Sequence, residues 1–563
     1  MVDILSKKKL RSTKTGNAAA LALAAIIIFG FVLSMLLFKG MSFYGDDASY
    51  VQYVPEILSG SFSETINIFS IRLLMNLPLS VFVGLLGYTD LGAGAWALIS
   101  YLAIIPLIYL IGKELEDARA GLIAALLFSF YPLILKFNSS PDPMLPMALF
   151  LSLSLLFFVR GRKRRSAKYY WLSGAAAFTA TLANPIAYLY ILFYAFYIVA
   201  SSIFDSAKKA SISFDSKQLY LFLGILTAIA LLGYVNLVLA NGNPFFELNM
   251  TNSYYSAAGG PDQIFYTNPS LTYYIKGYFP YGVIPFLSGN QSISSNSSNM
   301  VQDIFSLQQV QLNDVGFFGY FIAASGIYLI ARRKKKAYFA ILFASFIVAY
   351  MEFGSMSITH YFPIYKLMRF AVVAAVPLML VMGFALSEFI GNAKRKRFPD
   401  FRYRAVIAAA IIIFLLATSL PMDYYYYAYN HNSMLFIEQM ASDLKATNLS
   451  GSNIFAAGEV PGYLAYYLGY PANVHINQYD SGAYGGLFMP TCSSIPNDTY
   501  LIIPSQAGLE TINSYNLWSV NETWAFNPSQ CNFTLYADIL NMPEFSNTTI
   551  YSTAYSGNIY YKG

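Results

Sequence analysis

The feature that most constrains this chain is a series of long apolar segments separated by short, strongly basic turns. Runs long enough to cross a bilayer recur between residues 17 and 421, and RGRKRRSAK at 160–168 is typical of the turns. A hydrocarbon core ~30 Å thick requires about 20 apolar residues per helix. With 56% hydrophobic and only 11% charged residues, against about 25% charged in a soluble domain, the sequence predicts a polytopic α-helical membrane protein.

We expect eleven of these segments to span the membrane. The basic turns at 160–168, 331–336 and 392–404 belong in the cytoplasm, and parity then puts the N-terminus inside and the C-terminus outside. A twelfth apolar run, 71–88, is assigned to the exterior interface as a helical hairpin or juxtamembrane structure interrupted at Pro78. The expected spans are 17–39, 93–112, 120–137, 144–160, 171–187, 188–204, 218–240, 315–331, 337–352, 369–391 and 405–421.

Two further features agree with this topology. The opening KKKLRSTK and the apolar stretch after it resemble a secretory signal, but the stretch is too long and no small-residue cleavage site follows, which predicts a retained anchor. All nine N-x-S/T sequons fall in segments assigned to the exterior. They are Asn138, Asn249, Asn290, Asn296, Asn448, Asn497, Asn521, Asn532 and Asn547.

The segment after the last expected span, 422–563, is predicted to form a separate exterior α/β domain. SNIFAAG, EVPGYLAYYLGY and ANVHINQ have the patterns of strand, helix and strand, and TYLIIPS, FTLYADI and TIYSTAYSGNIYYK those of further strands. Cys492 and Cys531 would form a disulfide in an oxidising exterior, with two buried free thiols as the alternative. Residues 1–421 form the membrane domain, whose long exterior loops are 40–92 and 241–314.

Charge and motifs disfavour several functional classes. The net charge of +6 does not indicate nucleic acid, because the basic residues flank apolar runs and set orientation against membrane lipids. The absence of ionisable residues near the middle of any expected span disfavours an ion-coupled transporter or a proton pump. No P-loop, H-E-x-x-H or C-x-x-C pattern occurs, and three dispersed histidines predict no metal cage.

Ionisable residues concentrate instead at the expected outer interface. FYGDDASY at 43–50 places Asp46 and Asp47 directly after the first span, and NSSPDP places Asp142 in the next short exterior loop. The cations expected at the same depth include Arg72, Lys136, Lys366 and Arg369. Carboxylates opposite cations predict a reaction centre at the exterior membrane surface.

These motifs resemble the GT-C glycosyltransferases of the protein mannosyltransferase and aminoarabinose lipid A transferase type over about residues 40–200. YGDDASYVQYVPEILSG is similar to their first exterior loop with its acidic pair, and NSSPDPMLPMALF to the short loop with a second Asp. MRFAVVAAVPLMLVMGFAL resembles a late span that opens with Arg and contains Pro. The chain departs from the pattern at TLANP, with Asn184 where many members have Thr-Lys. It also lacks the W-W-D motif of the oligosaccharyltransferase branch.

The resemblance implies a GT-C fold and sugar transfer from a polyprenyl-phosphate donor to an acceptor hydroxyl of a protein, lipid or glycan at the exterior face. It assigns Asp46 as general base, worth about 10²–10⁴ in rate, Asp47 as the neighbour that orients the acceptor, and Asp142 as the second-loop acid. The side chains expected at the donor phosphate are Arg72, Lys136 and Arg369. Two carboxylates from different loops could also hold a divalent cation, which this branch does not imply.

Several candidate residues also have a purely structural explanation. Asp47 could cap the short helix ASYVQYV, Asp142 could be a turn residue before Pro143, and Lys136 could extend to lipid headgroups. Two other functions remain open on the sequence. The chain could be a lipid or polysaccharide exporter, or a cell-surface glycan-binding or assembly protein with a degenerate transferase core.

Overall fold

The protein is represented by a computed structural model in which two compact units are described separately. The first unit comprises Met1–Phe38, Ile66–Met75 and Trp96–Tyr424, and the second Lys39–Thr65, Asn76–Ala95 and Tyr425–Gly563. Within them, the structure describes residues 2–41, 46–61, 69–209, 224, 228, 231, 278, 315–354, 368–391, 401–447, 449–456, 460–471, 473–478, 499–504, 534–539 and 557–562.

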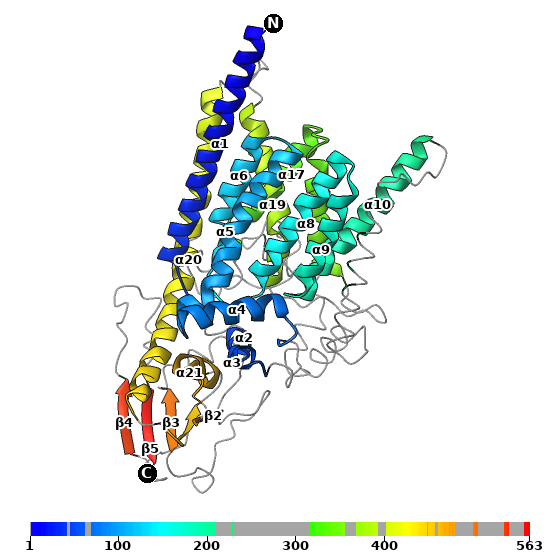
Figure 1. The fold of residues 1–563 in the computed structure, drawn as a ribbon. Helices are drawn as coiled ribbons and strands as arrows, with labels where there is room; N and C mark the ends of the chain where they lie inside the picture. Colours follow the sequence, from blue (N-terminus) through cyan, green and yellow to red (C-terminus); the bar gives the residue numbers. More distant parts are fainter. Residues whose placement is uncertain are drawn as a thin grey trace, which may run out of the picture. The chain divides into compact units, whose positions relative to one another are not determined.

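The first unit is built from apolar helices that lie side by side (Figure 1). Ten of the eleven expected spans overlap these helices, and 218–240 lies almost entirely outside the described residues. The helices are α1 (Val2–Leu36), most of α5 (Asp90–Leu115), α6 (Ala118–Ser129), α7 (Pro132–Leu135), α8 (Met144–Arg164), α9 (Ala167–Thr181), α10 (Tyr188–Lys209), α17 (Phe318–Ala331), α18 (Tyr338–Phe353), α19 (Val372–Gly391) and the first part of α20 (Phe401–Lys445), with the 3-10 turns η1 (Pro185–Ala187) and η2 (Met368–Ala371).

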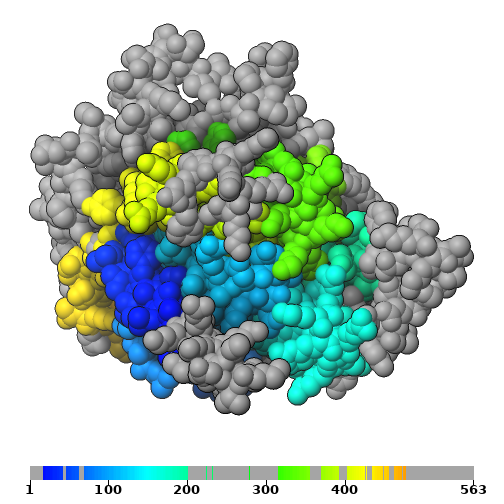
Figure 2. All heavy atoms as spheres, turned by 90° about the horizontal axis from the view of Figure 1, so that it is seen from above, coloured from blue at the N-terminus to red at the C-terminus, as the bar shows by residue number. Residues whose placement is uncertain are grey.

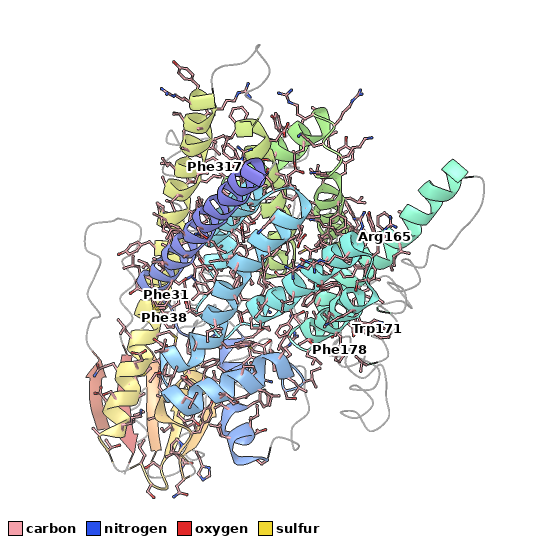
Figure 3. All side chains as sticks on the ribbon, turned by 45° about the horizontal axis from the view of Figure 1, so that its top comes forward. Phe31, Phe38, Arg165, Trp171, Phe178 and Phe317 are labelled. Atoms are coloured by element: carbon pink, nitrogen blue, oxygen red, sulfur yellow. The ribbon has the colours of Figure 1, made fainter. Side chains whose placement is uncertain are left out.

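Burial separates the inner helices of this unit from the outer ones. The apolar window of α19 is 100% buried, whereas the windows of α1 and α20 are 17% and 22% buried. The outer helices turn apolar side chains outward: Leu21 is 74% exposed and Trp171 43%, and Trp171 lies on the outside of α9 in Figure 3. A soluble protein rarely exposes such surface. Five described helices are long and apolar enough to cross a membrane, so the prediction of a helical membrane protein is confirmed.

Close packing in the first unit depends on small residues. A Cβ added to Gly383 of α19 would lie 2.7 Å from the carbonyl oxygen of Ala120 and 2.7 Å from the Cβ of Ala124, both on α6. Glycine therefore allows the two backbones to approach as they do in membrane helix pairs. Seen from above in Figure 2, the blue side chains of α1 lie beside sky-blue ones, and these border the cyan and green side chains of later helices.

The run 71–88 is a single helix, α4 (Leu73–Leu86), that continues through Pro78. A proline leaves the carbonyl four residues earlier without its helical donor. Here that carbonyl belongs to Leu74, and it accepts a hydrogen bond from the Trp96 indole Nε1 at 3.0 Å. The expectation that Pro78 interrupts this segment is wrong, because a side chain from the next helix supplies the missing donor.

The same arrangement occurs at the centre of the first unit. Pro377 lies inside α19, and the carbonyl it leaves without a backbone donor is that of Val373. The buried Tyr190 of α10 donates its hydroxyl to this carbonyl at 3.2 Å. The most buried helix thus keeps its backbone polar groups satisfied, as an apolar surrounding requires.

The second unit contains a mixed sheet of five strands in the order β2-β1-β3-β5-β4. β1 (Asn453–Ala456) pairs in parallel with β2 (His475–Gln478) and β3 (Thr499–Pro504), while β5 (Gly557–Lys562) is antiparallel to β3 and to β4 (Thr534–Ile539). Helix α21 (Val460–Leu468) connects β1 to β2. These elements lie in the stretches expected from the sequence, and Cys492 and Cys531 fall outside the described residues.

Two short helices of the first loop also belong to the second unit. They are α2 (Asp47–Val51) and α3 (Val54–Ser59), and α3 ends at Gly60 with a left-handed backbone. Helix α2 packs against α21. The acidic pair predicted to be catalytic therefore lies on an element that the tail of the chain supports.

Candidate functional site

Asp46 and Asp47 begin helix α2. Asp46 occupies the N-cap position and is half-buried, but its side chain makes no capping hydrogen bond, and Asp47 is the first helical residue, with 2% of its surface exposed. The alternative that Asp47 caps this helix is therefore wrong. The helix starts one residue earlier than that alternative requires, and the residue at the N-cap position is Asp46.

The two carboxylate oxygens of Asp142 contact different elements. Oδ1 accepts a hydrogen bond from the backbone N–H of Met144 at 2.8 Å, at the start of α8. Oδ2 lies 3.9 Å from Nη1 of Arg369, which belongs to η2 at the start of α19. The Asp142 side chain is 4% exposed and that of Arg369 20%. Asp142 thus makes the turn contact that the structural explanation expects and also the contact with a cation that the functional explanation expects.

Arg72 and Asn184 meet at the turn after α9. The guanidinium of Arg72, 7% exposed, donates through Nη1 to the carbonyl of Ala183 at 2.9 Å. The side chain of Asn184 accepts a hydrogen bond from the N–H of Ile186 at 3.0 Å and thereby caps η1. At the position where the family pattern has Thr-Lys, this chain uses an amide as a local cap, and Arg72 provides a cation at the same turn.

Lys136 lies at the C-cap of α7 and is half-buried, with its Nζ 5.8 Å from the centre of the Phe137 ring. Helix α7 packs against η2, the turn that contains Arg369. The structure thus brings Asp142 and Arg369 into contact and sets Lys136 on a neighbouring element. Lys366 is outside the described residues.

The basic turns lie at the opposite end of the same helices. Glu114, at the end of α5, pairs with Arg160 of α8 at 3.4 Å and with Lys163 at 2.8 Å. Glu388, near the end of α19, pairs with Lys334 in the turn between α17 and α18. These pairs join the end of α5 to the end of α8, and the end of α19 to the turn between α17 and α18, at one end of the first unit.

The two charged ends are about one bilayer core apart. Asp142 precedes α8 and Arg160 lies in its last two turns, and a rise of 1.5 Å per residue over that stretch corresponds to about 26 Å. A hydrocarbon core is ~30 Å thick. The Asp142–Arg369 pair therefore lies at the depth of one membrane surface when the basic turns lie at the other.

Two features of the site region were not found from the sequence. Asn138, one of the nine sequons, is fully buried and donates through Nδ2 to the Ser34 hydroxyl at 2.7 Å, so in this fold its amide is not accessible for glycosylation.

In the second unit, Asp90 accepts the Tyr467 hydroxyl at 2.6 Å, and the Glu438 carboxyl is hydrogen-bonded to Asp90. Asp90 follows an apolar run and precedes Gly92, a pattern that reads as a turn.

Burial and, after it, the neighbouring charge of Asp90 together raise the pKa of the Glu438 carboxyl to about 7. A like charge in contact disfavours ionisation of Glu438. Among the residues that the structure describes, no group of three or more His, Cys, Asp or Glu side chains is arranged to hold a metal ion.

Comparison with known proteins defines the class of the fold. Residues 73–234 match the family described as Dolichyl-phosphate-mannose-protein mannosyltransferase. A search of curated proteins finds no match. Among solved structures, ArnT from Cupriavidus metallidurans bound to undecaprenyl phosphate is similar with a TM-score of 0.51 at 12% identity, over 95% of this chain and 97% of that one. Its apo state gives 0.50 at 14% identity, over 97% and 98%.

A third structure shares part of this likeness. The Archaeoglobus fulgidus oligosaccharyltransferase complex with Zn and sulfate gives a TM-score of 0.47 at 13% identity over 80% of this chain, and the chain spans 62% of the length of that protein. The protein has the fold of the GT-C superfamily of membrane glycosyltransferases. Residues 73–234 match the protein mannosyltransferase family model, so the resemblance expected from the sequence is confirmed.

Proposed function

We propose that the protein transfers a sugar from a polyprenyl-phosphate donor to an acceptor hydroxyl at the exterior face of the membrane. The observation that carries the proposal is the contact between Asp142 and Arg369 at the opposite end of α8 and α19 from the basic turns. It supports a site at a membrane surface, where a lipid-linked substrate can present its phosphate. The similar ArnT structure contains undecaprenyl phosphate.

The reaction needs a base, a leaving group and a cation. In the proposed step, Asp46 takes the proton of the acceptor hydroxyl, with Asp47 beside it to orient the acceptor, and the acceptor oxygen forms a bond to the anomeric carbon. The bond between that carbon and the phosphate oxygen breaks, and the lipid phosphate leaves with the electron pair. The charge that develops on the phosphate is stabilised by cations, for which Arg72, Lys136 and Arg369 are the candidates.

The arrangement of the chain in the membrane is part of the proposal. We assign the basic turns at 160–168, 331–336 and 392–404 to the cytoplasm, which gives eleven spans, a cytoplasmic N-terminus and an exterior domain at 422–563. The ion pairs that gather two of these turns with Glu114 and Glu388 support their placement on one side. In this orientation Cys492 and Cys531 face an oxidising compartment and pair.

The test is sugar transfer by the full-length protein in proteoliposomes supplied with polyprenyl-phosphate sugars and candidate acceptors. Asp46→Asn is expected to lower kcat about 10²–10⁴-fold, because a general base contributes about that factor. Asp47→Asn is expected to raise KM for the acceptor. The matched control is Glu56→Gln on α3 in the same loop, which should transfer sugar as the unmodified protein does.

Two results would contradict the proposal. Full transfer by Asp46→Asn, with Asp47→Asn also active, removes the assignment of the base. Movement of a lipid or polysaccharide across the vesicle bilayer without any covalent product identifies an exporter instead. Assays with and without a chelator show whether a divalent cation takes part.

A further inference from the structure

Asp90 joins three segments of the second unit. Its Oδ1 accepts the Tyr467 hydroxyl of α21 at 2.6 Å and the backbone N–H of Met41 at 3.3 Å. Gly40 has a left-handed backbone, with φ of +64°, and a Cβ there would lie 2.2 Å from the Asp90 Cγ. The loop 39–41 can therefore lie directly on this carboxylate only because it has glycine at this position.

Helix α21 is bound to the same segment through a second tyrosine. The Tyr466 hydroxyl donates to the carbonyl of Thr89 at 2.8 Å, and its ring meets the edge of Tyr88 with centroids 5.4 Å apart. Burial raises the pKa of Tyr466 and of Tyr467, so both remain hydrogen-bond donors at physiological pH. Two consecutive residues of α21 are thus fixed to residues 88–90.

Glu438 of α20 completes the cluster with a second carboxyl. It is hydrogen-bonded to Asp90 and to Tyr467, and these are the groups that act on it besides burial. The buried Lys39 lies in the preceding loop, next to Gly40. Asp90 accepts hydrogen bonds from Tyr467 and Met41 at the N-terminus of α5, so we assign the proton between the two carboxyls to Glu438.

The other end of α21 touches the helix that contains the proposed base. A Cβ on Gly462 would lie 3.0 Å from the Ala48 Cβ of α2. Asp46 and Asp47 are the residues immediately before Ala48. A continuous set of contacts therefore leads from Asp90 and Glu438 through α21 to the acidic pair.

We propose that Asp90, Glu438 and Tyr467 form a proton-sharing clamp that holds α21 in place and so positions α2 for catalysis. The inference rests on the sugar transfer proposed above. The three residues are positioning residues, since they act on the reaction only through α21. When Glu438 loses its proton, two adjacent negative charges repel each other, the hydrogen bond between them is lost, and the hold of the clamp on α21 is weakened.

The direction of the pH effect follows from the raised pKa. A carboxyl that titrates near 7 in the fold, and near 4.5 when unfolded, has no effect on the folded clamp below about pH 4.5, disfavours it progressively as the pH rises from there through about 7, and reaches its full cost above that. The clamp is thus closed below neutrality and opens above it. The proposed base has the opposite dependence, because it must be deprotonated.

The experiment compares pH profiles of kcat and KM for the full-length protein in proteoliposomes. We expect the activity of the unmodified protein to fall about tenfold between pH 6.5 and 8.5, since the protonated fraction of a group titrating near 7 falls by at least that factor. In Glu438→Gln the amide donates permanently to Asp90, so activity at the two pH values should agree within about twofold. Asp443→Asn, at a half-buried carboxylate on the same helix that accepts a hydrogen bond from Gln439, should retain the profile of the unmodified protein.

Hydrogen exchange gives a readout that does not depend on activity. In the unmodified protein, α2 and α21 should exchange faster at pH 8.5 than the intrinsic rate change explains, and Glu438→Gln should abolish the excess. Tyr467→Phe removes one hydrogen-bond donor and should produce the excess exchange of α2 and α21 already at pH 6.5. This variant replaces Glu438→Gln in the test if Glu438→Gln does not fold.

The outcomes separate the two proposals. Identical pH profiles and identical exchange for the unmodified protein and Glu438→Gln overturn the clamp whether or not sugar is transferred. A pH-dependent excess of exchange that Glu438→Gln removes supports the clamp even if no variant transfers sugar, a result that would count against the proposed function alone.

Discussion

Arg369 and Asp142 come from distant parts of the chain, yet a guanidinium nitrogen of one lies 3.9 Å from a carboxylate oxygen of the other. The second oxygen of Asp142 holds the first turn of α8, and Arg369 stands just before α19. One carboxylate therefore fixes the start of one helix and faces the cation at the start of another. Substitutions at Arg369 and at Asp142 can therefore test binding of the phosphate and the role of the acid separately.

Neutralising Arg369 should weaken binding of the donor lipid. Arg369→Gln is expected to raise the Kd for undecaprenyl phosphate about 10–100-fold, because a hydrogen bond to a charged group contributes about 1.5–3 kcal/mol. Titration of the purified protein with the lipid measures this change. Arg164→Gln, at the other end of α8, is the control and should bind as before; equal affinity in both variants would remove Arg369 from the phosphate site.

Two substitutions of Asp142 distinguish a turn residue from an acid of the reaction. Asp142→Asn keeps an oxygen for the Met144 N–H but loses the charge, whereas Asp142→Ala loses both and should cost about 1 kcal/mol in stability. We expect the Asn variant to unfold at the unchanged temperature and to transfer sugar poorly. Normal transfer by Asp142→Asn would leave Asp142 only its role in the turn.

The bond from Tyr190 to Val373 should matter only while residue 377 is proline. Tyr190→Phe leaves a buried carbonyl without a donor, at a cost of about 1–3 kcal/mol. In a Pro377→Ala background the backbone N–H of residue 377 takes over, so the same change should cost much less. Thermal unfolding of the four proteins in detergent gives the double-mutant cycle, and equal costs in both backgrounds would contradict the coupling.

Close approach of α19 to α6 should make Gly383 intolerant of a side chain. Gly383→Ala places a methyl group 2.7 Å from Ala124 Cβ and is expected to destabilise the protein by about 1–3 kcal/mol. Gly326 of α17 has nothing within 4 Å of its added Cβ, so Gly326→Ala should leave the unfolding temperature unchanged or raise it. A similar change of unfolding temperature in both variants would mean that the close approach of α19 to α6 does not limit stability.

The helices of the first unit could be predicted because their signal is local. A run of about 20 apolar residues between basic turns defines a span by itself, and α8 and α19 begin and end near the expected residues. The interruption at Pro78 was predicted wrongly because the donor that replaces the missing N–H is on Trp96, outside the segment. Sequence patterns along one helix contain no information on such a partner.

The candidate site could be predicted only in part, because contacts between distant segments do not show in the pattern of one segment. The types of residue at Asp142 and Arg369 follow from charge at the ends of spans, but their contact depends on how α8 and α19 pack. Asp90 and Glu438 were missed because each is an ordinary surface carboxylate in its own segment. Only the folded unit brings the two carboxyls together.

Helix α8 also sets a length scale. Asp142 stands just before its first residue and Arg160 near its end, so the two are separated by a rigid rod of about 26 Å. In a bilayer of much greater hydrocarbon thickness, the two ends cannot both remain at a water interface without tilt or local thinning, each at a cost in free energy. Activity in vesicles should therefore depend on acyl-chain length, with an optimum where the lipid matches this one helix.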